Sequence, residues 1–422
     1  MMYWLVNILT LLVLLGFWYR TLPAQERLVF ALAVAARLAA GVALGLLYTY
    51  YYIGEGDTFL FFHDATLVTS AGRGDFGLFL QFPFSADSGL PLVNNQPRSL
   101  FFIWIVAGIN FFTGSSYWLT SLWLSLFSFA GAWYLVRKIA QGFPRLRWAA
   151  AIAFLFFPSV VFWSSGVIKE SLAFGGLCFL SGFLFTLFTN TKPRMGEYAL
   201  AAVSLYLLLN LKYYWAAVFF PSVATAWLIR LWPLHRYWSL TKMATIWMVI
   251  LVATCLLVSQ LHPNFYLQNF LEVIKTNHDA FVAFSQQTLY IHYYQLEASW
   301  SSMAVNAPWA LLSGLVRPFL FEARSPLQVL GGLENLLLLV LFLFQIFRVQ
   351  VPSGNNRLVF FSLVTYVSVL CIFLALSTPN FGTLSRYRIG FLPYFVFLLM
   401  MHVPFLRQRT VQKIIKRVTP FR

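Results

Sequence analysis

Long, nearly uncharged apolar segments recur along the whole 422-residue chain, and they limit what it can fold into. A helix needs about 17 to 25 such residues to cross the hydrocarbon core of a bilayer. In hydrocarbon, only helices and closed barrels satisfy all their backbone hydrogen bonds. The segments are 3–19, 28–50, 117–136, 148–163, 169–189, 198–211, 213–229, 243–261, 327–347, 358–378 and 389–406. The sequence therefore predicts an all-α, polytopic transmembrane helix bundle.

Two shorter apolar segments, 99–113 and 307–321, extend the expected number of helices to about 11–13. The Arg317-Pro318 pair interrupts the second segment, so we expect that segment not to cross the membrane. No basic residues precede the first helix and no small-residue cleavage site follows it, which favours a retained helix over a signal peptide. We find no internal repeat and no room for a soluble domain. Residues 1–422 are therefore predicted to form a single transmembrane domain.

The charged residues make up only 10% of the chain, whereas soluble proteins carry roughly 25%. The net charge of +16 does not indicate a nucleic-acid partner, because the basic residues lie in short clusters between apolar segments. Such clusters mark the cytoplasmic side of a membrane protein. They lie in the loops 137–147 and 230–242 and in the tail 407–422. We therefore expect a multi-pass protein of the bacterial cytoplasmic membrane with these three segments inside.

Two longer polar segments, 51–97 and 262–306, are predicted to be the large extracytoplasmic loops. The first holds five of the 13 acidic residues, which favours the outer side. The second contains histidines and acids without the spacing of a zinc site, so we interpret it as a lid or a substrate-facing loop.

An acidic turn, Gly54-Glu55-Gly56-Asp57-Thr58, follows the second apolar segment, and His63-Asp64 comes shortly after it. Two carboxylates in a glycine-flanked turn can converge on one site. They can bind a divalent cation such as Mg²⁺ or Mn²⁺, or one of them can take a proton from a hydroxyl nucleophile. A solvated turn followed by an interfacial amphipathic helix is the alternative.

Lys169-Glu170 stands at the start of an apolar segment, where charges are costly and are functional by default. Ser164 or Ser165 could cap the helix that begins there, and the helix N-terminus and Lys169 would then suit a phosphate. The alternative is an ion pair that only marks the helix end.

Arg386 and Arg388 enter the last apolar segment on the side predicted to be external, against the usual charge bias. The planar guanidinium group suits phosphate or pyrophosphate. Snorkelling to lipid headgroups is the alternative. Arg317, with Glu322 and Arg324 nearby, forms a further basic cluster, and Lys212 stands among aromatic residues at the junction of two segments.

Taken together, these motifs resemble the GT-C superfamily of polyprenyl-phosphate-dependent glycosyltransferases over about residues 28–190 and 380–400. The matching features are the acidic turn after an early helix, the stretch 97–137 with Thr113-Gly114, Pro158-Ser159, and Arg386-x-Arg388 followed by Pro393. The chain departs from that pattern in its Glu-Gly-Asp spacing, in its extra N-terminal helix and in having no C-terminal periplasmic domain.

The resemblance implies transfer of a sugar from a polyprenyl-phosphate-linked donor to an extracytoplasmic lipid, glycan or protein acceptor. Asp57 would be the general base or a ligand of the cation, supported by Glu55. The expected substrate-binding residues are His63, Asp64, Lys169, Glu170, Arg317, Arg386 and Arg388. Two alternatives stay open. The Ser164–Glu170 segment is also similar to bacterial polysaccharide repeat-unit polymerases, and a flippase or transporter of lipid-linked glycans is the other alternative.

Overall fold

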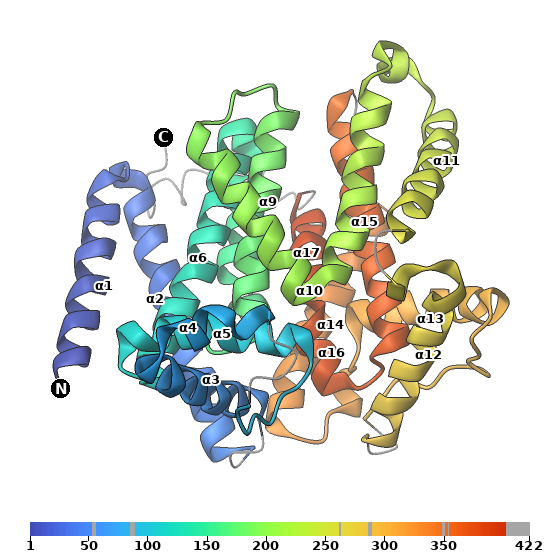
Figure 1. The fold of residues 1–422 in the computed structure, drawn as a ribbon. Coiled ribbons are helices and arrows are strands. Elements are labelled where there is room, and N and C mark those ends of the chain that lie inside the picture. Colours follow the sequence, from blue (N-terminus) through green and yellow to red (C-terminus); the bar gives the residue numbers. More distant parts are fainter. Residues whose placement is uncertain are drawn as a thin grey trace. The chain divides into compact units, whose positions relative to one another are not determined.

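The computed structural model describes residues 1–52, 56–84, 89–260, 263–285, 289–347, 351–352 and 354–401. The acidic residue Glu55 and the predicted cytoplasmic tail 407–422 lie outside these residues. Within them every named element is a helix, and the one antiparallel bridge joins Tyr290 to Asn380. Eight helices of this described part are long and apolar enough to cross a membrane. The predicted all-α, polytopic helix bundle is confirmed (Figure 1).

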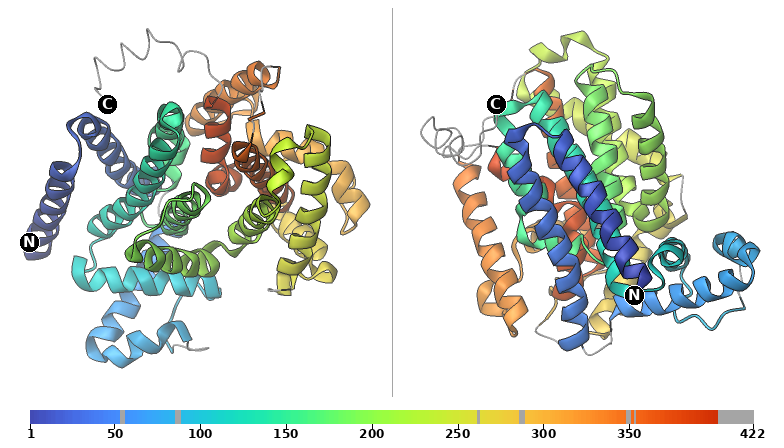
Figure 2. Two further views of the ribbon diagram at one scale, coloured as in Figure 1. Left: turned by 90° about the horizontal axis from the view of Figure 1, so that it is seen from above. Right: turned by 90° about the vertical axis from the view of Figure 1, so that its left-hand side faces the viewer.

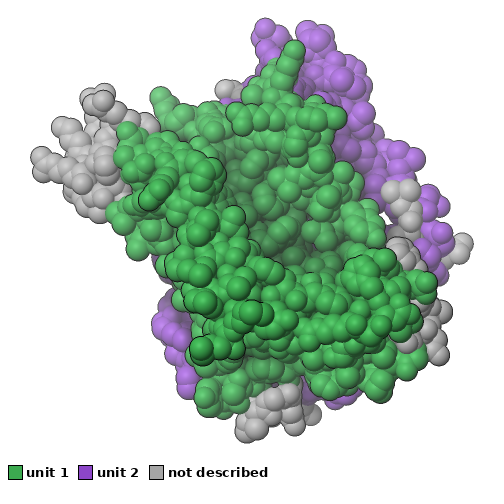
Figure 3. Space-filling model, turned by 60° about the vertical axis from the view of Figure 1, so that its left-hand side comes forward, with its two compact units in different colours: residues 1–213, 404–422 green, residues 214–403 purple. Residues whose placement is uncertain are grey.

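The described chain forms two compact units, Met1–Tyr213 and Tyr214–Val403 (Figure 3). The single membrane domain expected from the sequence stays a prediction. The helices of unit 1 are α1 (Met2–Thr21), α2 (Ala24–Tyr50), α3 (Asp57–Gly74), α4 (Phe76–Gln81), α5 (Pro97–Thr113), α6 (Tyr117–Gly142), α7 (Arg147–Ala151), α8 (Pro158–Trp163), α9 (Lys169–Phe188) and the first part of α10 (Met195–Arg230). The helices of unit 2 are the rest of α10, α11 (Leu240–Ser259), α12 (Leu267–Ala283), α13 (Trp300–Val316), α14 (Pro326–Ile346), α15 (Asn355–Ser377), α16 (Phe381–Tyr387) and α17 (Leu392–Met400).

In unit 1, α2, α6 and α9 run along one another, and α1 pairs with α2 in an antiparallel hairpin (Figure 2). The closest packing joins α6 to α9, where a Cβ atom on Gly131 would lie 2.2 Å from the carbonyl oxygen of Gly175. Small residues allow such backbone contact, which replaces the hydrophobic driving force that is missing inside a membrane.

Ion pairs mark one end of this bundle. Glu26 at the start of α2 lies 3.2 Å from Arg137 near the end of α6, and Lys138 lies 2.5 Å from Glu197 at the start of α10. At the opposite end, α3, α4 and α5 lie across the bundle (Figure 1). The described parts of the acidic segment 51–97 and the basic loop 137–147 therefore lie at opposite ends of unit 1.

Three predicted spans differ from simple helices. The segment 148–163 divides into α7, a π-helical turn (Ile152–Phe156) and α8, with Pro158 in the first turn of α8. The segments 198–211 and 213–229 join in α10, but Lys212 between them has non-helical angles (φ −143°, ψ 57°). Helix α13 ends at Val316, immediately before the Arg317-Pro318 pair. That the segment 307–321 does not cross the membrane stays a prediction.

Candidate functional site

Five charged side chains interact electrostatically at the end of unit 1 that carries α3 and α5. Asp57 begins α3, Arg98 lies in the first turn of α5, Lys169 and Glu170 begin α9, and Lys212 lies at the break in α10. Electrostatic interactions link Lys169 to each of the other four. We call these five residues the charged cluster. Four elements that are far apart in the sequence supply it.

The start of α3 is fixed by its second residue, Thr58, which is fully buried. The Thr58 hydroxyl donates to the carbonyl oxygen of Val167 at 2.9 Å and lies 2.8 Å from the Tyr117 hydroxyl. Gly56 packs so closely on Tyr48 that a Cβ atom there would lie 1.9 Å from the ring. These contacts hold Asp57, whose side chain is exposed, beside the segment that leads into α9.

A buried arginine holds the segment between α8 and α9 in place. Arg37 of α2 is fully buried and donates to Ser128 Oγ at 3.1 Å, to the Phe154 carbonyl oxygen at 2.9 Å and to Ser164 Oγ. Gly166 takes a positive φ of 82°. Its N–H donates to Ser125 Oγ at 2.9 Å. Polar groups inside a membrane bundle are satisfied in this way by neighbouring helices. The hydrogen bonds of Arg37 and Gly166 therefore fix the position at which α9 begins.

The prediction that Ser164 or Ser165 caps α9 is wrong. The residue before the helix is Ile168, and no side chain caps it. The hydroxyls of Ser164 and Ser165 donate instead to the carbonyl oxygens of Val160 and Val161, because both serines close the last turn of α8.

Lys169 and Glu170 are neighbours in sequence but have different partners. Lys169 is half-buried; its Nζ donates to Ser99 Oγ at 2.8 Å and lies 4.6 Å from the centre of the Phe61 ring. Glu170 is buried and accepts from Lys212 Nζ at 2.8 Å. The buried ion pair with Lys212 is therefore a structural contact. Lys169 lies nearer the surface, and its charge can reach a ligand.

The charged cluster contains three basic side chains and two carboxylates, which is a formal excess of one positive charge. Arg98 is also half-buried, and its guanidinium lies 5.3 Å from the centre of the Tyr213 ring. No family model, curated protein or solved structure matches this chain. The chemistry of the cluster suits an anionic group next to a carboxylate that can exchange a proton.

The described residues do not test the predicted divalent cation. Among them, no three histidine, cysteine, aspartate or glutamate side chains come together as metal ligands. Asp57 is described and Glu55 is not, and a single carboxylate does not make a cation site. The cation stays a prediction.

The other predicted site residues of unit 1 lie behind Asp57 on α3. Asp64 is fully buried and accepts hydrogen bonds from the N–H groups of Val93 and Asn94 at 3.1 and 3.0 Å and from the Asn94 amide at 2.9 Å. It thereby fastens the loop that leads to α5. His63 is exposed, with Nδ1 3.5 Å from Asp64 Oδ1.

The predicted arginines belong to unit 2 and have local partners there. Arg317 donates to both carboxylate oxygens of Glu322. Arg388 is buried, with Nη2 3.6 Å from Glu334 Oε1. Arg386 lies 5.4 Å from the centre of the Tyr387 ring. Their predicted role in phosphate binding stays a prediction.

Sequence reasoning missed Arg98 and gave little weight to Lys212. Both positions carried a signal, since each is a lone cation at the boundary of an apolar segment.

Proposed function

We propose that the protein is a membrane glycosyltransferase that moves a sugar from a polyprenyl-phosphate-linked donor to an acceptor on the outer side of the membrane. The observation that carries the proposal is the exposed Asp57 carboxylate within electrostatic reach of the half-buried Lys169 at the end of a membrane helix. The resemblance of the acidic turn to the GT-C superfamily supports the same assignment.

The depth of the cluster supports an outer site. Lys169 begins the 20-residue helix α9, which at about 1.5 Å per residue spans roughly 30 Å, the thickness of the hydrocarbon core. The opposite end of unit 1 carries Arg137 and Lys138 of the basic loop 137–147, which the charge bias assigns to the cytoplasm. A donor with its chain in the bilayer would present its phosphate at the level of the cluster.

In the proposed reaction, Lys169 and Arg98 bind the donor phosphate. Asp57 accepts the proton of the acceptor hydroxyl as that oxygen bonds to the anomeric carbon of the sugar. The bond from the anomeric carbon to the phosphate oxygen breaks, and the polyprenyl phosphate leaves with the bonding electron pair. Lys169 and Arg98 stabilise the charge that grows on this phosphate.

The first prediction concerns Asp57. In Asp57→Asn the side chain keeps its size but cannot accept a proton, so we expect transfer to fall by about 10²–10⁴-fold, the usual contribution of a general base. Sugar transfer is measured with membranes that contain equal amounts of variant and wild-type protein, followed by mass spectrometry of the glycan product.

Asp75→Asn is the matched control. Asp75 is the N-cap residue just before α4 in the same unit, and its side chain accepts from the N–H of Gly77 at 2.8 Å. Asparagine caps helices as well as aspartate does, so this variant should keep full activity. Wild-type activity of Asp57→Asn would exclude the proposed base. Glycan ladders in place of one added sugar would assign the protein to the polymerases, and donor binding without a covalent product to the transporters.

A further inference from the structure

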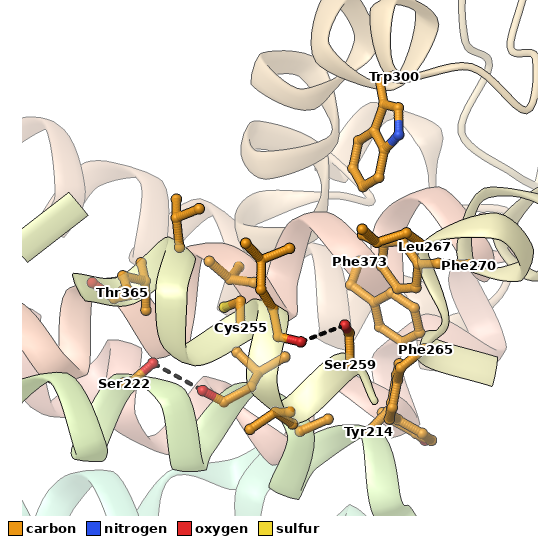
Figure 4. Close-up of a pocket in the computed structure, with 17 residues that line it drawn as sticks. Tyr214, Ser222, Cys255, Ser259, Phe265, Leu267, Phe270, Trp300, Thr365 and Phe373 are labelled. Atoms are coloured by element: carbon orange, nitrogen blue, oxygen red, sulfur yellow. Dashed lines mark hydrogen bonds between the residues drawn. The ribbon is translucent and has the colours of Figure 1, made fainter. Parts of the chain in front are cut away.

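An apolar pocket of about 400 Å³ lies inside unit 2 (Figure 4). The second part of α10, α11, α12 and α15 form its walls, with Trp300 at the start of α13. Aromatic rings crowd one side of it. The rings of Phe270 and Phe373 stack at 5.9 Å, and Trp300 lies 6.2 Å from Phe270. Its volume and its apolar, aromatic lining are those of ligand-binding pockets.

Three hydroxyl groups of the lining, those of Ser222, Ser259 and Thr365, hydrogen-bond to the protein. Ser222 donates to the carbonyl oxygen of Val218 at 2.9 Å, and Ser259 donates to that of Leu256 at 2.8 Å (Figure 4). Thr365 Oγ1 accepts from the indole N–H of Trp247 at 3.0 Å. The pocket therefore offers hydrocarbon surface, and these groups do not select a polar headgroup.

The pocket reaches the surface of unit 2 along α11. Val252 and Leu256 line it and are themselves 52% and 45% exposed. On the same helix Val249 and Leu257, which do not line the pocket, are exposed as well. Because α11 is apolar enough to span the membrane, these exposed residues face lipid chains, and the opening of the pocket lies next to the bilayer interior.

We propose that this pocket binds one acyl chain of a bilayer phospholipid, whose headgroup stays outside the pocket. An apolar lining distinguishes chains poorly, so the most abundant chain in the membrane should occupy it by mass action. This inference does not depend on the proposed glycosyltransferase activity, because the pocket and the charged cluster belong to different units.

The experiment uses the full-length protein in vesicles of phosphatidylcholine, with a few per cent of the lipid carrying a diazirine near the end of one acyl chain. After irradiation, labelled positions are mapped by mass spectrometry of peptides. We expect adducts on pocket residues of α11 and α15 that are not exposed to the surrounding lipid, such as Leu251 and Phe373. Adducts on Val249 measure contact with the surrounding lipid and serve as the internal reference.

Ala217→Phe places a ring inside the pocket. If this ring excludes about two methylene groups of the acyl chain from the pocket, the ratio of pocket to reference adducts should fall roughly tenfold. Ala224→Phe is the matched control, two turns further along α10 and outside the lining. It should leave the ratio unchanged. If Ala217→Phe does not fold, Val369→Phe narrows the pocket from α15, at a side chain already 41% exposed.

Equal ratios in the wild type and in the folded pocket variant would overturn the proposal. Labelling of pocket residues by a diazirine-bearing isoprenyl phosphate, without labelling by the phospholipid probe, would also overturn it, because the occupant would then be an isoprenoid. The expected result is labelling by the acyl probe that only the pocket-filling substitution removes.

Discussion

At the scale of single residues, the charged side chains of unit 1 divide by burial. Glu170 and Lys212 are 2% and 4% exposed and bond to each other, whereas Lys169 is half-buried and Asp57 is exposed. Buried charges are stable only when paired, so the inner pair serves the structure. Lys169 and Asp57 are accessible to a ligand.

The buried pair leads to a prediction about stability. Glu170→Leu or Lys212→Met alone leaves one uncompensated buried charge, so each should lower the free energy of unfolding by roughly 3–5 kcal/mol. The double variant removes both charges and should recover most of that loss. Thermal unfolding of the purified variants in detergent measures the difference. If the double variant loses as much free energy of unfolding as the two single variants together, the pairing of Glu170 with Lys212 is contradicted.

Sequence reasoning found Lys169 and Glu170 because charges at the edge of an apolar segment are costly wherever they occur. It could not assign their partners. Ser99 and Lys212 lie 70 and 42 residues away in the chain, and only the packing of α5 and α10 on α9 brings them close. Asp64 was interpreted as a substrate ligand because local sequence does not reveal that its oxygens hold the loop at Val93 and Asn94.

At the scale of elements, α12 is an amphipathic helix packed on α15, outside the candidate membrane spans. Its buried face holds Leu271, Ile274 and His278. His278 Nδ1 donates to the carbonyl oxygen of Leu376 at the end of α15, at 3.0 Å. The predicted loop 262–306 therefore contains a helix that is joined to a membrane span by a titratable group.

This contact predicts a dependence on pH. Burial lowers the pKa of His278 below its ordinary value of 6.5, and this effect exceeds the opposing effects of the Leu376 carbonyl and of Asp279. The packed helix therefore favours neutral imidazole. Its stabilisation is complete above about pH 6.5 and is lost as the pH falls below that value.

Hydrogen exchange of the α12 amides, corrected for the intrinsic effect of pH, measures this change between about pH 7.5 and pH 5.5. Protection should decrease at the lower pH in the wild type. In His278→Gln, which cannot titrate, protection should be independent of pH. His63→Gln is the control, because His63 is exposed on α3 and should not influence α12. Equal loss of protection in His278→Gln would exclude His278 as the cause.

At the scale of the whole molecule, the lengths of the apolar segments were enough to predict the helical bundle and most of its long apolar helices. They could not predict the break inside 148–163, because a π-helical turn has the same composition as the α-helix around it. Nor could they show that α3 and α5 lie across the end of unit 1, since short apolar helices can cross a membrane or lie at its surface.

The opposite placement of the acidic and basic loops predicts the orientation of unit 1. After Cys255, the exposed one of the three cysteines, is replaced by alanine, Ser70→Cys on α3 and Gln141→Cys at the end of α6 provide exposed thiols. A membrane-impermeant thiol reagent added to intact cells should label position 70 and not position 141. The reverse pattern would place the charged cluster on the cytoplasmic side.

The hydrogen bonds of Arg37 also constrain how the protein is made. Ser128 and Ser164 lie 91 and 127 residues later in the chain, so ribosomes must add them after α2 has been synthesised. At about 5–20 residues per second, Ser164 follows after roughly 6–25 seconds. During that interval α2 carries an unpaired arginine at a cost of about 2.5–3.5 kcal/mol for entering the bilayer. The hydrogen bonds that satisfy Arg37 can therefore form only when α6 and the segment after α8 have arrived beside α2.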